Sequence, residues 1–166
     1  MKFNFLVLLL SALIPMIIGF IWYNPKVFGK AWMRAAELDE NRLKGGNMAV
    51  IFGVSFLLSF FIAMVLQSIV IHQWGIYSTL MNEPGIKDPN SEISLYIKDF
   101  FDKYGNNFRT FKHGALHGTI TGIMFATPIL AINALFERKT FKYIAINGGY
   151  WTVTLALMGG VICAYV

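Results

Sequence analysis

The sequence predicts an all-α integral membrane protein, a four-transmembrane-helix bundle that forms a single domain over residues 1–166. Three observations predict this fold class. Hydrophobic residues make up 56% of the chain, they gather in four long runs, and nearly all of the charge lies between those runs. Soluble domains contain ~45–50% apolar residues, so this excess indicates a membrane protein.

The four runs are residues 5–22, 48–71, 114–136 and 141–166. Each reaches or approaches the ~20 residues with which a helix crosses a hydrocarbon core ~30 Å thick. Backbone amides find no water there, so all four runs are expected to be helical. Pro15 and Pro128 lie inside the first and third runs and predict kinks in those helices.

Short amphipathic helices are expected in the first two connecting segments. In the first, Lys26, Lys30 and Arg34 recur every fourth residue, which favours a helix lying on anionic lipid headgroups. In the second, apolar residues within 91–104 follow the helical i, i+3, i+4 spacing, with Gly105 as an end. A membrane or a protein surface is expected beneath this second helix.

The charges of the connecting segments predict the orientation in the membrane. The first and third segments carry an excess of Lys and Arg, whereas the segment between residues 72 and 113 is balanced. Basic short loops face the cytoplasm, so both termini and the long segment are expected on the outer, periplasmic side of a bacterial inner membrane. The cations that carry this argument are Lys26, Lys30, Arg34, Arg42, Lys44, Arg138, Lys139 and Lys142.

Small residues at four-residue spacing predict where helices pack closely. Lipid supplies no hydrophobic force between helices, so small side chains that allow close approach must replace it. One stripe follows the third run and one the fourth, and either an intramolecular contact or a homo-oligomer interface would use them. The glycines concerned are Gly114, Gly118, Gly122, Gly148 and Gly160.

The most distinctive polar residues are His113 and His117, at i and i+4 where the third run begins. This spacing turns two imidazoles to one helical face, as a two-histidine metal site requires. His72 is the natural third ligand, with Asp99 or Asp102 behind it. The alternatives are hydrogen bonding to a neighbouring helix or headgroups, haem binding, and pH sensing; no cofactor is predicted outright.

Asn133 and Asn147 lie within the third and fourth runs, where polar groups usually face the interior of a bundle. Interhelical hydrogen bonds are therefore expected for both and for Gln67, with Glu137 among the headgroups. No nucleophile–base set, phosphate loop, cysteine pair or membrane-embedded aspartate is present, so no enzymatic activity is predicted. The basic residues that give the net charge of +5 lie beside the apolar runs, where they would contact lipid headgroups. This placement argues against nucleic acid as a partner.

Three stretches resemble the bacterial membrane domain-of-unknown-function family number 1761. They read IGFIWYNPKVFGKAWM after the first run, NALFERK at the end of the third, and INGGYWTVTLALMGG in the fourth. The resemblance implies four membrane helices and no particular reaction. It suggests a shared face made by Trp22, Tyr23, Asn24, Pro25, Gly29, Lys30, Trp32, Asn133 and Glu137, with membrane anchoring as the alternative role.

These observations favour a non-enzymatic structural or interaction protein of the membrane. Its expected partners are the bilayer, anionic headgroups, and either further copies of itself or a larger membrane complex. The alternative is binding or transport of a small molecule, lipid or ion by the helix bundle, with a metal or haem held by the histidines.

Overall fold

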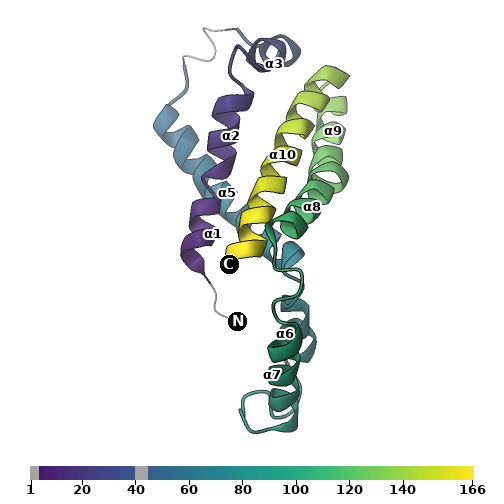
Figure 1. The fold of residues 1–166 in the computed structure, drawn as a ribbon. Coiled ribbons are helices and arrows are strands. Elements are labelled where there is room, and N and C mark those ends of the chain that lie inside the picture. Colours follow the sequence, from purple (N-terminus) through teal and green to yellow (C-terminus); the bar gives the residue numbers. More distant parts are fainter. Residues whose placement is uncertain (1–3, 40–44) are drawn as a thin grey trace.

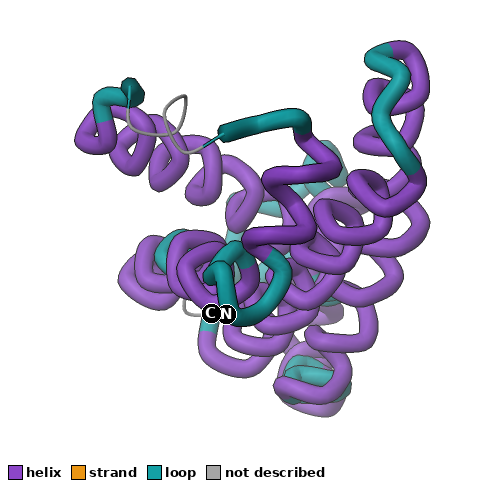
Figure 2. Tube along the Cα trace, turned by 90° about the horizontal axis from the view of Figure 1, so that it is seen from above, coloured by secondary structure: helices purple, strands orange, loops and turns teal. Residues whose placement is uncertain are grey.

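A computed structural model describes residues 4–39 and 45–166 of the chain. These residues form helices and loops, and no strand occurs among them (Figure 2). In chain order the helices are α1 (Phe5–Ser11), α2 (Ile14–Trp22), α3 (Gly29–Ala36), α5 (Met48–Val70), α6 (Trp74–Leu80), α7 (Glu92–Tyr104), α8 (Phe111–Thr121), the π-helical turn η1 (Gly122–Ala126), α9 (Thr127–Phe136) and α10 (Phe141–Tyr165).

In the described part of the chain, four helical segments are long and apolar enough to cross a membrane: Phe5–Trp22, Met48–Val70, Phe111–Phe136 and Phe141–Tyr165. The third begins three residues earlier than the apolar run predicted, because the Thr110 side chain accepts a hydrogen bond from the His113 amide and caps the helix. The helix expected at 91–104 runs from Glu92, with Ser91 as its cap. Helix α6 was not predicted.

Both intramembrane prolines interrupt their helices. The first apolar segment breaks between Ser11 and Ile14, directly before Pro15. The third contains η1 directly before Pro128, where the backbone N–H of Thr127 donates to the Gly122 carbonyl. Proline lacks an N–H and clashes with the carbonyl four residues earlier, and a locally widened turn removes that clash.

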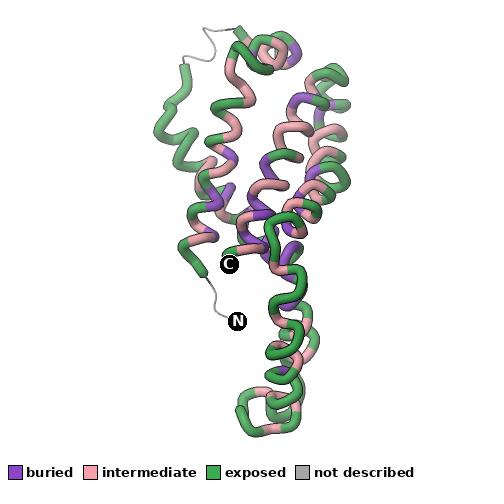
Figure 3. The backbone as a smooth tube through the Cα atoms, viewed as in Figure 1, coloured by how far each residue is buried: buried purple, intermediate pink, exposed green. Residues whose placement is uncertain are grey.

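Helix α10 is the central element, with α8, η1 and α9 on one side and α1, α2 and α5 on the other (Figure 1). Half of its apolar window (50%) is buried, against 22% or less in the other three segments. Buried residues of α10 form the core with buried residues of α1 and α5, and Figure 3 colours these buried positions purple along the backbone. That core contains Leu8, Ala63, Leu66, Val70, Leu155, Met158 and Ile162.

The closest helix pair is α8 and α10. A Cβ atom on Gly114, Gly118 or Gly122 would collide with the backbone of Gly159, Leu155 or Thr152 respectively. On α10 the backbone contact therefore follows residues 152, 155, 156 and 159. Gly148 instead faces the Thr127 side chain, and Gly160 faces the Phe111 ring.

Helices α6 and α7 extend beyond the end of the other helices, on the side where α1 begins and α10 ends (Figure 1). They associate through side chains. The rings of Tyr77 and Phe101 stack at 5.0 Å, and the Gln73 amide donates to the carbonyls of Gly105 and Asn107. Part of the apolar face of α7 is thus covered by α6, while Tyr96 and Tyr104 remain exposed.

Candidate metal site and family-motif face

Three histidines meet at the junction of α5 and α8. His72 follows the last residues of α5, and His113 and His117 occupy the first two turns of α8. Their ring centroids lie 4.5 Å apart for His113 and His117, and 4.9 and 4.8 Å from His72. The nitrogen atoms that could bind a metal all lie within 4.8 Å of one another.

Nε2 of His113 is buried and has no hydrogen-bond partner among the described residues. A buried imidazole nitrogen without a partner is costly, so this atom suits a ligand that the chain itself does not supply. The His72 side chain is exposed, and the other two are partly buried. The cluster therefore opens to one side of the molecule.

The donor set fits a first-row transition-metal ion. Imidazole nitrogens bind Zn²⁺ at ~2.0–2.1 Å, so two nitrogens on one tetrahedral ion lie about 3.3 Å apart. The candidate ligand nitrogens now lie up to 4.8 Å apart, so binding one ion would require the side chains to rotate toward each other. Asp99 and Asp102 do not belong to the group: on the exposed face of α7 they pair with Lys103 and Lys98.

Three residues that no sequence pattern singled out tie the histidine-bearing segments together. The Cys163 thiol donates to the carbonyls of Val70 (3.2 Å) and Phe108 (3.3 Å). Nε of Arg109 donates to the Cys163 carbonyl at 2.7 Å, and partial burial lowers the pKa of this guanidinium from its usual value. Gln73, which follows His72 directly, donates to the carbonyls of Gly105 and Asn107. The spacing of these three residues carries no signal of this role.

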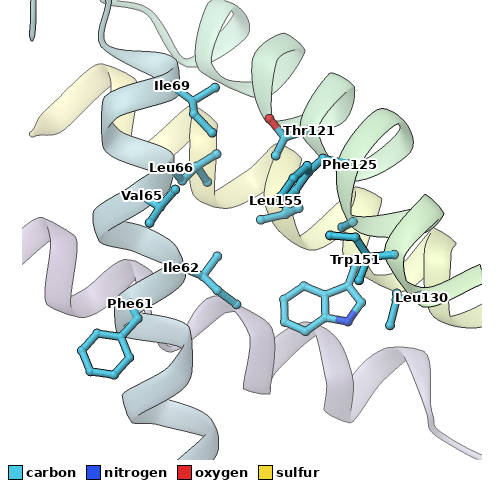
Figure 4. A pocket seen from close by; sticks show the side chains of 12 residues that line it. Phe61, Ile62, Val65, Leu66, Ile69, Thr121, Phe125, Leu130, Trp151 and Leu155 are labelled. Atoms are coloured by element: carbon cyan, nitrogen blue, oxygen red, sulfur yellow. The ribbon is translucent and has the colours of Figure 1, made fainter. Parts of the chain in front are cut away.

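An apolar cavity of about 480 Å³ lies deeper, between α5, the α8–η1–α9 segment and α10 (Figure 4). Trp151 and Leu155 of α10 line it together with Ile62 and Val65 of α5. Thr121 is its one hydroxyl, and that group already donates to the His117 carbonyl at 2.8 Å. Among the described residues, this cavity can therefore contact an apolar ligand but has no unbonded hydroxyl to hydrogen-bond it.

The residues after the first span pack against α10 at the other end of the molecule. The Trp22 indole donates to the Ile146 carbonyl (3.1 Å), and the Tyr23 hydroxyl donates to Oδ1 of Asn147 (2.8 Å). The expected interhelical hydrogen bond of Asn147 is thus confirmed. Burial raises the pKa of Tyr23 above its usual range, so the hydroxyl stays protonated as a donor.

Contacts within the turn between α2 and α3 explain why several residues of the stretch IGFIWYNPKVFGKAWM are needed there. Oδ1 of Asn24 accepts from the Lys26 amide, and the rings of Trp22 and Phe28 and of Tyr23 and Trp32 contact each other. Gly29 approaches the Tyr23 carbonyl so closely that a Cβ atom would overlap it. Pro25 and Lys30 are exposed.

The other two residues of the expected shared face, Asn133 and Glu137, lie in the last turn of α9 and just after its end. Asn133 lies at an exposed position of α9, so the expected interior hydrogen bond is wrong for this residue. Glu137 is also exposed, and Lys139 pairs instead with Glu37 at the end of α3, at 3.1 Å. Helical periodicity gave no means of telling which face of α9 turns to α10. Gln67 is buried beside α6.

Comparison with curated proteins finds no match to this chain, and neither does comparison with solved structures. Comparison with protein families matches residues 6–163 to one family, described as "Protein of unknown function (DUF1761)". The match covers nearly all of the four apolar segments, together with the histidine cluster and the turn after α2. The chain therefore belongs to the DUF1761 family.

Proposed function

We propose that this protein is a membrane-embedded metal-binding module in which His72, His113 and His117 hold one divalent first-row transition-metal ion. The observation that carries the proposal is the proximity of three imidazoles around the buried, unpartnered Nε2 of His113. Three histidine ligands with one side open leave a coordination position for water or another ligand. Imidazole suits Zn²⁺, Cu²⁺ and Ni²⁺ well.

The proposal includes a location. We propose that the four apolar segments cross a bacterial inner membrane as a bundle, with α3 and the α9–α10 turn on the cytoplasmic side. The cations Lys26, Lys30, Arg34, Arg138 and Lys142 at that end support this orientation. Arg42 and Lys44, which also supported it, lie outside the described residues. The histidines would then face the periplasm.

Bound metal would link two parts of the fold, because its ligands come from two separate segments of the chain. His72 lies two residues beyond the end of α5, and the other two belong to α8. A metal ion bridging them would tie α5 to the tightly packed α8–α10 pair. The proposal is one of binding, with no chemical reaction assigned.

The test is metal titration of detergent-purified protein carrying an affinity tag that contains no histidine. Co²⁺ is a useful probe because tetrahedral coordination gives strong visible absorption bands. One equivalent is expected to bind, Zn²⁺ is expected to displace it, and His113→Ala and His117→Ala should each abolish the signal. Lys112→Ala, next to His113 on the exposed surface, is the matched control and should bind normally. Metal content that is absent, or equal in all variants, would refute the proposal.

A second candidate function is that of an interaction module in a homo-oligomer or a larger membrane complex. The projecting α6–α7 segment favours it, because Leu95, Tyr96 and Tyr104 are exposed there. The glycines of α8 already contact α10 within the chain, so a partner would have to use another surface. Native mass spectrometry of protein extracted from its own membrane tests this function. A stable assembly lost on Leu95→Glu and Tyr96→Glu substitution would support it, and a monomer would count against it.

A further inference from the structure

A second cavity, of about 560 Å³, lies in the half of the helices remote from the histidines. It is bounded by α2, the N-terminal half of α5, and α10. Its walls are mostly apolar, yet hydroxyl groups reach it from α5, from α10 and from the end of α2. They belong to Tyr23, Ser55, Ser59 and Tyr150.

Ser55 and Ser59 lie one helical turn apart on α5, so they share one face. Neither hydroxyl has a hydrogen-bond partner within residues 4–39 and 45–166. Three other hydroxyls in the apolar segments have partners, since Thr119, Thr121 and Thr152 each donate to the carbonyl four residues earlier. The buried Thr154 hydroxyl, which does not line this cavity, has no partner among the described residues. Hydroxyls at membrane depth normally find partners because an unpaired polar group there is costly. The two serines are therefore available to a ligand.

The tyrosines on the opposite wall contribute acceptors. Tyr150 donates its proton to the Pro15 carbonyl at 2.8 Å, and Tyr23 donates to Asn147. Each phenolic oxygen keeps its lone pairs, so a ligand hydroxyl could donate to either. No charged side chain lines the cavity among the residues that the structure describes. A charged headgroup would thus lack a counter-charge inside it.

We propose that this cavity binds an uncharged lipid, whose hydrocarbon chain lies along the apolar walls and whose carbonyl or hydroxyl oxygen hydrogen-bonds to Ser55 and Ser59. The occupant must come from the bilayer, because α2, α5 and α10 all belong to segments suited to cross it. A few polar groups converging within an apolar cavity are typical of small-molecule sites. The cavity in Figure 4 has a single hydroxyl that is already bonded, so it discriminates less between ligands.

The test uses the full-length protein in nanodiscs and a monoacylglycerol carrying a photoreactive diazirine in its chain. Crosslinked peptides are expected from α2, α5 and α10 around Gly19, Ser59 and Tyr150. Excess unlabelled monoacylglycerol should compete, whereas an alkyl phosphate of the same chain length should not. Loss of two membrane hydrogen bonds predicts that Ser55→Ala/Ser59→Ala lowers labelling about five- to tenfold.

Ser68→Ala is the matched control, since Ser68 lies exposed on the same helix and does not line the cavity. It should label like the wild type. Ser55→Leu, which fills the cavity from a half-buried position, should abolish labelling while leaving Co²⁺ binding at the histidines intact. Labelling spread evenly over the outer helix surfaces, equal labelling of the double-alanine variant, or competition by the alkyl phosphate would each overturn the proposal.

Discussion

At the scale of single residues, glycines decide how closely the two best-packed helices approach. Gly114, Gly118 and Gly122 each bring the backbone of α8 against that of α10, where no side chain would fit. In lipid, helix association depends on such close contacts, because van der Waals packing replaces the hydrophobic force between helices. These positions should therefore be intolerant of even one methyl group.

Gly118→Ala is expected to destabilise the protein by about 1–3 kcal/mol or more, since its new Cβ would overlap the Leu155 carbonyl. Backbone cannot rotate aside as a flexible side chain can. The measurement is the unfolding midpoint in a detergent mixture of rising SDS content. Gly53→Ala is the control, because the space beside Gly53 is open within 4 Å. Equal midpoints for the two variants would show that α8 and α10 can separate without loss of stability.

A residue-scale effect of smaller size is expected at Tyr23. Tyr23→Phe removes the hydrogen bond to Asn147 and leaves the ring contacts with Trp32 and Tyr150 in place. Polar bonds between membrane helices average about 0.6 kcal/mol, so a loss of about 0.5–1 kcal/mol is expected in the same unfolding assay. Because Asn147 also donates to the Tyr143 carbonyl, it keeps one partner in the variant. A loss above about 3 kcal/mol would contradict this interpretation.

At the scale of elements, the α6–α7 segment depends on very few contacts. The Gln73 amide satisfies two carbonyls at the end of α7, whereas the Lys98–Asp102 and Lys103–Asp99 pairs lie in the open. Exposed pairs of this kind contribute little to stability. A buried amide that serves two backbone acceptors contributes more, because both acceptors lose their partner when it is removed.

Gln73→Ala should accordingly accelerate amide hydrogen–deuterium exchange in α6, α7 and the following turn, with little change in α10. Local opening requires fewer broken contacts than global unfolding, so the effect is expected to stay within the projecting segment. Asp102→Asn serves as the comparison and should exchange like the wild type. Faster exchange throughout α10 would mean that α6 and α7 are part of the cooperative core.

At the scale of the whole molecule, the proposed orientation and the proposed metal site can be tested independently. The single cysteine, Cys163, is fully buried, so the wild-type protein should resist a membrane-impermeant maleimide in intact cells. Asn90→Cys, beside α7, is expected to react from outside. Lys26→Cys, after the first span, should react only once the membrane is opened. The reverse labelling pattern would show that the protein has the opposite orientation in the membrane.

Zn²⁺ should raise the unfolding midpoint of the wild type, because a ligand that binds only the folded state stabilises it. At one hundred times the dissociation constant the gain is about 2.7 kcal/mol. His72→Ala should lose most of this gain while folding normally, since His72 is exposed. Metal-bound histidine must be unprotonated, so the gain should also disappear under acidic conditions. An equal gain in His72→Ala would show that His72 does not bind the metal.

The fold class followed from patterns that act locally along the chain. Long apolar runs, helical spacing of apolar residues, and prolines such as Pro15 and Pro128 act through the chain near them, so the apolar segments and α7 were predicted within a few residues. The i, i+4 spacing likewise puts His113 and His117 on one face of any regular helix, whatever packs against it.

The tertiary structure decided which faces of the helices contact each other. The short helix α6 offered no long period to detect, and only packing turned Asn147 inward and Asn133 outward. His72 reaches the other histidines because α5 and α8 meet at this end, held by Cys163, Arg109 and Gln73 from distant parts of the chain. Periodicity defines a face of one helix, but its partner depends on how the helices are rotated and crossed, which no local pattern encodes.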